Sequence, residues 1–278
     1  MRITATFFTY GLLGSIIWCC VVGINRGQTR QWQHVRTLPI EAKRVWPLAT
    51  GGWLALRADG VLQLYDGQGQ ASNYFWSDRL LGVPDAVDAS QPLTIVLFFE
   101  SFQQVIWLDR TLSVLAVLSF AEAGLTQVRA VAAAPDRRLW CYDTQLRQLL
   151  LLDVDGQIDM RSAPFDLLSE MVPQQVKWLQ RHAAHLFFWA PPQLWMFDDF
   201  GQLMKQYTVE SACEALFILP PWFVCQKAEV LSWQRLDHPL SQRIMELPKA
   251  ANEVYQLVWN GADLYLLTEE GLELWYFE

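Results

Sequence analysis

Two histidines three residues apart, His182 and His185, form the pattern in this 278-residue chain that comes nearest to a metal site. Imidazole nitrogens bind zinc or copper when Cys, carboxylate or further His side chains complete the ligand set. A helix would place both rings on one face, but in RHAAHLFF the two residues flank a turn that leads into a strand. No Cys or carboxylate stands at ligand spacing, and we therefore expect no metal here.

Acidic side chains are the second group with catalytic or binding chemistry. The run DVDG (153–156) lacks the further acidic positions and the closing Glu of a calcium loop, and we interpret it as a turn. A glycosidase needs a pair of carboxylates. The candidate carboxylates are Asp85, Asp88, Glu100 and Glu253. Nothing in the sequence brings these four side chains into pairs.

Motifs for nucleophilic and nucleotide chemistry are missing. The sequence contains no G-x-S-x-G elbow, no G-x-x-x-x-G-K loop and no G-x-G-x-x-G. We therefore expect no catalytic residue, no cofactor and no bound metal.

Three of the five cysteines lie outside the N-terminal segment: Cys141, Cys213 and Cys225. Cys213 and Cys225 flank the turn at Pro220-Pro221, so they face each other across an expected hairpin. They either form a disulfide or stay reduced as two small buried hydrophobes, and we favour the second interpretation.

The apolar composition of residues 1–27 predicts a signal peptide or a membrane anchor. Arg2 is followed by an apolar stretch from Ala5 to Ile24, which we expect to form a helix. About 19 apolar residues just span a bilayer, so the segment either stays as an anchor or is cleaved.

Cleavage has two candidate positions. Signal peptidase would cut after Gly23, whereas a lipoprotein peptidase would cut before Cys19 or Cys20, which would then carry the lipid. Trp18 is a poor match to the small residue that usually precedes a lipidated cysteine. Each outcome places residues 28–278 on the same side of a membrane. We expect an exported, membrane-associated protein of the periplasm or outer membrane.

An acidic residue closes an apolar run at intervals of 39 to 45 residues along the rest of the chain. A period of this length is typical of the four-stranded blades of a β-propeller. The runs are short, apolar or alternating, and bounded by turn residues, as strands are. The closing acids are Asp66, Asp109, Asp153, Asp198, Asp237 and Glu278.

A hairpin turn of the form Asp-x-x-Gly-Gln recurs at three of these acids, Asp66, Asp153 and Asp198. The Asp side chain caps a type I turn, and the Gly takes the positive φ with which the chain rejoins the ladder. We expect structural roles for Asp66, Asp109, Asp153, Gly156, Asp198 and Gly201. Two runs that lack the Gly, LDRTLS (108–113) and LDHPLS (236–241), resemble each other.

Six repeats of about 42 residues account for residues 28–278. We expect them to form one all-β, six-bladed propeller of four-stranded blades. The sixth repeat supplies only three strands before Glu278, whereas a spare strand at 31–40 precedes the first repeat. This N-terminal strand is predicted to complete the sixth blade and close the ring. A two-sheet sandwich or an open array of hairpins is the alternative, and it leaves the even spacing unexplained.

The composition fits a packed domain: 52% of residues are hydrophobic, 18% are charged and 14 are Trp. The net charge is −8 without any basic block, so we expect no nucleic-acid partner. Tryptophans recur in the predicted third strands, where we expect them to pack between blades rather than bind sugar. These are Trp107, Trp195, Trp233 and Trp275.

The stretch RAVAAAPDRRLWCYDTQLRQLLLLDVDGQI (129–158) resembles blades of NHL-type propellers and of the sensor propellers found outside bacterial membranes. Together with PPQLWMFDDFGQLMK (191–205), it is similar to a group of uncharacterised exported bacterial propellers. This resemblance covers about a quarter of the chain, implies the architecture, and carries no catalytic residue over. The Gly-His and Trp-Asp signature of WD repeats and the A-x-D-x-x-T-G-K pattern of quinoprotein blades are absent.

These features predict a non-catalytic scaffold that docks onto a membrane or envelope protein complex. The candidate docking loop is FDLLSEMVPQQ (165–175), through Phe165, Leu167, Leu168 and Met171. The other interpretation folds this loop onto its own blade. The alternative function is a propeller enzyme, lactonase-like or glycosidase-like, that acts on a small molecule or a sugar at the channel mouth.

Overall fold

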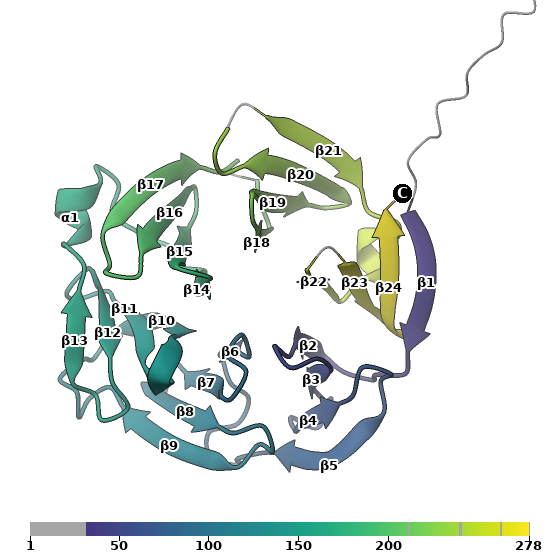
Figure 1. Cartoon of the computed structure of the whole chain (residues 1–278), viewed down its shortest axis with the longest axis horizontal. Helices are drawn as coiled ribbons and strands as arrows, with labels where there is room; N and C mark the ends of the chain where they lie inside the picture. Colours follow the sequence, from purple (N-terminus) through teal and green to yellow (C-terminus); the bar gives the residue numbers. More distant parts are fainter. Residues whose placement is uncertain (1–31, 211, 239–240, 262, 278) are drawn as a thin grey trace, which may run out of the picture. The chain divides into compact units, whose positions relative to one another are not determined.

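The computed structural model describes residues 32–277, apart from 211, 239–240 and 262. Six four-stranded antiparallel sheets are arranged as blades around a central axis (Figure 1). The all-β, six-bladed architecture predicted from the sequence is thereby confirmed. The apolar helix expected in residues 1–27 lies outside the described residues, as do Cys19 and Cys20.

The strands follow one another from the inner to the outer edge of each blade. Blade 1 contains β2 (Arg44–Pro47), β3 (Trp53–Leu56), β4 (Leu62–Tyr65) and β5 (Ala71–Trp76). Blade 2 contains β6 (Ala86–Asp88), β7 (Ile95–Phe99), β8 (Gln104–Leu108) and β9 (Val114–Ser119). Blade 3 contains β10 (Val128–Ala133), β11 (Leu139–Asp143), β12 (Gln148–Leu152) and β13 (Ile158–Arg161). Blade 4 contains β14 (Trp178–His182), β15 (His185–Ala190), β16 (Gln193–Asp198) and β17 (Leu203–Thr208). Blade 5 contains β18 (Ala215–Leu219), β19 (Trp222–Lys227), β20 (Val230–Arg235) and β21 (Gln242–Glu246). Blade 6 contains β22 (Gln256–Asn260), β23 (Asp263–Thr268), β24 (Gly271–Phe277) and, from the other end of the chain, β1 (Trp32–Leu38).

The ring closes where β1 pairs with β24. The antiparallel register runs from Trp32 opposite Phe277 to Leu38 opposite Leu272. Figure 1 shows β1 as the outermost strand of the last blade, beside β24. The N-terminal strand therefore completes blade 6, as the spare strand in the sequence predicted.

The core consists of six apolar clusters, one between each pair of neighbouring blades. Because neighbours cover both faces of a blade, the middle strands are the most buried ones: every residue of β7 and β11 is buried, whereas β20 of blade 5 is mostly half-buried. Trp107 and Trp195 are at most 1% exposed in two of these clusters, while Trp233 and Trp275 are half-buried at a third. Packing between blades is thereby confirmed for these tryptophans.

The recurrent aspartates cap the turns between third and fourth strands. Asp153 Oδ1 accepts the backbone N–H groups of Asp155 (2.9 Å) and Gln157 (2.8 Å). The Gly156 N–H donates to the Asp153 carbonyl, and Gly156 has a φ of +83°. A Cβ at Gly156 would lie 2.9 Å from the Leu118 side chain, so both conformation and space call for glycine there.

The same two side-chain bonds recur in blades 1, 2 and 4. The capping residues are Asp66, Asp109 and Asp198. Gly201 has a φ of +75° in blade 4, and in blade 2 Leu112 occupies the glycine position with a φ of +60°.

The contacts of Asp237 in LDHPLS differ from those of Asp109 in LDRTLS. The carboxylate of Asp237 pairs with the Arg235 guanidinium (2.7 and 2.5 Å), and the Ser241 N–H donates to the His238 carbonyl. Proline has no backbone N–H, so Pro239 cannot supply the first capping bond that Thr111 supplies in blade 2. The hydrogen bond from Arg235 lowers the pKa of Asp237 to about 2.

One buried carboxylate lies at the closure. Glu273 of β24 is 1% exposed, and it accepts hydrogen bonds from Lys249 Nζ (2.6 Å), Trp275 Nε1 (2.9 Å) and Thr268 Oγ1 (3.0 Å). Burial by itself would raise the pKa of Glu273, but these bonds and the Lys249 charge lower it below the ordinary value. Glu273 is therefore ionised and fully paired where the two ends of the chain meet.

Replacing Asp153 by Ala should lower the free energy of unfolding by about 1–2 kcal/mol, because two backbone N–H groups lose their acceptor. Asp153→Asn should cost much less, since its amide oxygen still accepts both bonds. Urea unfolding of the two variants beside the wild type measures the difference. Equal losses for Ala and Asn would contradict a capping role.

Replacing Glu273 by Ala should lower the free energy of unfolding by about 3 kcal/mol at pH 7, because Lys249 loses its partner in a largely buried site. A carboxyl whose folded pKa is lowered stabilises the fold above the unfolded pKa and loses that contribution as pH falls through the folded pKa. The stability difference between the wild type and Glu273→Gln should therefore shrink below pH 4.5, the ordinary value. Urea midpoints between pH 3 and 7 test this, and a pH-independent difference would contradict it.

Candidate functional site: the central channel

The inner strands of all six blades surround a channel of about 540 Å³. Small and apolar side chains such as Ala86, Ala130 and Val258 make up much of its wall. Four charged side chains line it as well: Asp88, Arg129, Lys177 and Arg181. This is the concave site in which binding or catalysis would be expected.

Three of these four charged residues already have partners. Asp88 accepts the N–H groups of Ala133 in blade 3 (2.8 Å) and of Ser90 (2.9 Å). Arg129 of blade 3 forms an ion pair with Glu100 of blade 2. Arg181 binds both carboxylate oxygens of Asp199 at 2.9 Å within blade 4. Asp88 and Arg129 thus connect neighbouring blades.

Two glutamine side chains also connect blades. Gln256 of blade 6 receives the Val45 N–H (2.7 Å) and donates to the Val45 carbonyl (3.0 Å) in blade 1. Gln103 of blade 2 bonds both backbone groups of Val128 in blade 3 (2.8 and 2.9 Å). Sequence reasoning missed both, because an isolated Gln carries no signal for a contact as far as 211 residues away.

The four candidate carboxylates have separate roles. Asp85 accepts the Glu100 N–H at 2.7 Å, while Asp88 and Glu100 hold the inter-blade contacts described above. Glu253 lies in a short 3-10 helix, Ala251–Glu253, that precedes β22. These contacts do not join the four into an acid and base pair.

His182 and His185 face each other across the hairpin between β14 and β15. Desolvation by the surrounding protein, with a smaller effect of His185, lowers the pKa of His182, so its ring is neutral at pH 7. The described part of the chain contains no group of three or more His, Cys, Asp or Glu side chains placed to hold a metal ion.

The expected docking loop is divided between core and surface. Phe165 begins helix α1 (Phe165–Leu168), is fully buried, and packs edge-on against Tyr142 and Trp195 at 5.4 and 5.3 Å between ring centroids. The ring of Phe165 anchors the loop to the core between blades 3 and 4 and is not exposed for docking. Leu168 packs partly against the same core, whereas Leu167 and Met171 are 80% and 44% exposed.

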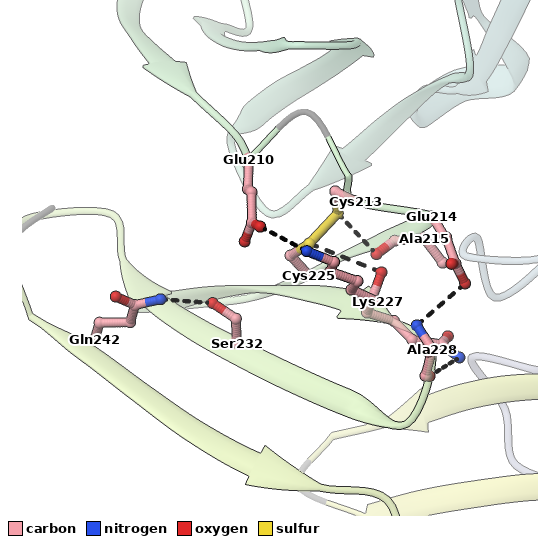
Figure 2. Close-up of a disulfide and its surroundings, with 10 residues drawn as sticks. Glu210, Cys213, Glu214, Ala215, Cys225, Lys227, Ala228, Ser232 and Gln242 are labelled. Carbon is pink, nitrogen blue, oxygen red and sulfur yellow. Dashed lines mark hydrogen bonds and ion pairs between the residues drawn. A yellow bond between two sulfur atoms is a disulfide. The ribbon is translucent and has the colours of Figure 1, made fainter. Parts of the chain in front are cut away.

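Cys213 and Cys225 form a disulfide, so the expectation of two reduced thiols was wrong (Figure 2). Their Cα atoms are 5.6 Å apart, within the usual range for a bridge. The bond ties the segment before β18 to β19, and an ion pair between Lys227 and Glu210 (3.1 Å) lies beside it in Figure 2. Cys141 is fully buried, and burial raises the pKa of its thiol far above the usual range.

Removing the disulfide, through Cys213→Ser with Cys225→Ser, should lower the free energy of unfolding by about 2–3 kcal/mol, because it closes a short loop in the unfolded chain. Reductant should shift the urea midpoint of the wild type, but not that of the double variant. Peptide mapping without reduction should recover the linked peptides. Unlinked peptides and a midpoint that does not respond to reductant would contradict the bridge.

Among the described residues, no helix is long and apolar enough to cross a membrane.

The chain matches no protein-family model and no curated protein. Among solved structures it is similar to the WD40 domain of Pan2 from Neurospora crassa, with a TM-score of 0.53 and 9% identity over 88% of this chain and 94% of that one. It is also similar to BamB from Moraxella catarrhalis (TM-score 0.46, 12% identity, 81% and 70% coverage). The computationally designed protein Ika8 gives a TM-score of 0.48 at 15% identity, with 81% and 67% coverage. At 9% identity, the similarity to the Pan2 domain shows the β-propeller fold alone.

Proposed function

We propose that this protein is a non-catalytic interaction propeller of the bacterial cell envelope. It is held at a membrane by its N-terminal segment and binds a membrane or envelope protein complex. The observation that carries the proposal is the use of the channel's polar side chains. Asp88, Arg129 and Gln256 bond to groups of neighbouring blades, and Arg181 bonds to Asp199. Reacting groups must instead be free to contact a substrate.

Two features support a location in the envelope. The disulfide between Cys213 and Cys225 is typical of proteins that fold in an oxidising compartment. The apolar stretch from Ala5 to Ile24 has the composition of an export signal or anchor. Both features favour a propeller outside the cytoplasm.

A second candidate function rests on Lys177. Lys177 lines the channel and has no ion-pair partner within the described residues, whereas Arg129 and Arg181 are each paired with a carboxylate. The unpaired charge of Lys177 suits an anionic small molecule. Binding of such a molecule is the first step that an enzyme at the channel mouth would require.

Affinity purification of the tagged full chain from native membranes in mild detergent tests the scaffold proposal. We expect a membrane or envelope protein to co-purify in a fixed stoichiometric ratio. The intact mass of the purified chain reports whether residues 1–27 are retained, cleaved after Gly23, or replaced by a lipidated cysteine. Recovery of the protein alone in the soluble fraction would contradict the proposal and direct attention to ligands of the channel.

A further inference from the structure

The outer strands of the six blades differ in charge. An exposed sheet edge carries unpaired backbone groups, and charged side chains normally keep other chains from pairing with it. Charged residues occupy four of the outer strands: Arg36 in β1, Asp159 and Arg161 in β13, Lys205 in β17, and Arg243 and Glu246 in β21. The other two, β5 (ASNYFW) and β9 (VLAVLS), have none. Blades 1 and 2 therefore lack this protection.

Apolar side chains are exposed along the same two strands. On β9, Val114, Leu115 and Val117 are 53%, 42% and 51% exposed, while Tyr74 and Phe75 of β5 are 49% and 63% exposed. From Thr111 to Ala121 the sequence has no charged residue. The outer strand of blade 2 thus combines an open edge with an uncharged apolar surface.

The backbone of β9 has a defined free edge. Phe120 donates its N–H to the Gln103 carbonyl (2.9 Å), which fixes the phase of the ladder between β8 and β9. Antiparallel residues alternate between facing the partner strand and facing away from it. In the register that places Val117 opposite Ile106, the N–H and C=O of Val117 therefore point away from β8. Within the described residues β9 is the last strand of its sheet, so this edge has no neighbour.

The exposed ends of β5 and β9 lie close together. Trp76 at the end of β5 and Leu112 just before β9 belong to one buried cluster between blades 1 and 2. Figure 1 shows the two strands following one another along the rim. The apolar surface of β9 therefore continues toward Tyr74 and Phe75.

We propose that the free edge of β9 binds an extended, uncharged segment of a partner protein, which adds to blade 2 as a fifth strand. The inference rests on the proposed function and names the surface that carries it. A strand is the occupant that pairs with the Val117 backbone, and apolar side chains on it would cover Val114, Leu115 and Val117. The six residues of β9 match a partner strand about 20 Å long.

Charge favours a foreign strand over a second copy of this chain. Each copy carries a net charge of −8, so pairing two copies would bring two strongly acidic molecules together. Glu122, just after β9, is exposed, whereas before β9 the charge of Asp109 is offset by the neighbouring Arg110. An uncharged strand with a basic residue at the Glu122 end therefore fits this edge.

The test uses the full chain in mild detergent and a fluorescein-labelled peptide, KTVTVTVTK, as the probe. Its control, KTVTPPVTK, carries two adjacent prolines that remove a donor from each edge of the strand. We expect the wild type to bind the first peptide and not the second in fluorescence anisotropy. Val117→Lys and Leu115→Lys should each weaken binding about tenfold or more. Ile244→Lys, at an exposed apolar position on the charged outer strand β21, should bind as the wild type does.

Thermal unfolding confirms that each variant is folded. Val117→Lys and Leu115→Lys test the same edge independently, so a loss of binding in both variants supports the proposal. Equal binding of both peptides, no binding by the wild type, or wild-type affinity in both β9 variants would overturn the proposal. The proposal would also be overturned if Leu167→Lys in the α1 loop weakened peptide binding while the β9 variants did not. If the wild type formed a dimer and Val117→Lys were monomeric, the occupant of the β9 edge would be a second copy of this chain, and the proposal would be overturned.

The experiments distinguish a failure of the β9-edge proposal from a failure of the proposed scaffold function. A membrane partner that co-purifies equally with the wild type and with Val117→Lys would leave the proposed function standing and refute the β9 edge. Peptide binding at β9 by a protein that purifies alone from membranes would refute the proposed function and support the edge.

Discussion

Closure of the ring by β1 and β24 is the interaction on which the rest of the structure depends. Every blade buries both faces of its sheet against neighbours, so an open ring would expose the faces of two blades at once. Pairing strands from the two ends of the chain removes that opening and also covers the edge of β24. The buried, fully paired carboxylate of Glu273 lies at this junction, opposite Thr37 of β1.

Burial between blades also explains where the polar groups are found. The middle strands meet mostly apolar neighbours, so most polar side chains lie at the turns, in the channel and on the outer strands, and Glu273 of β24 is an exception. In the turns, aspartates satisfy the backbone of their own hairpin. In the channel, the side chains of Gln256, Asp88 and Arg129 connect adjacent blades. Packing between blades constrains the side chains of the outer strands least, and their charge differs from blade to blade.

The sequence predicted features that depend on local chemistry and on counting. An aspartate that caps its own turn repeats with the blade, and a three-stranded last repeat requires a strand from elsewhere. Contacts set by the meeting of distant elements were missed. The bond between Gln256 and Val45 depends on the register of two blades 211 residues apart. The side of α1 on which Phe165 lies, and the approach of Cys213 to Cys225, depend on how loops return to the sheet. For Asp237, the proline two residues later was a local signal against the general turn pattern.

Native-state hydrogen exchange of β1 tests the central claim that closure holds the ring together. If the pairing of β1 with β24 is integral to the ring, amides of β1 such as Leu38 exchange only through global unfolding, with the same free energy as amides of β12. Exchange of β1 at a much lower free energy, while β12 keeps its full protection, would show that the ring is stable without its closing strand and would contradict this account.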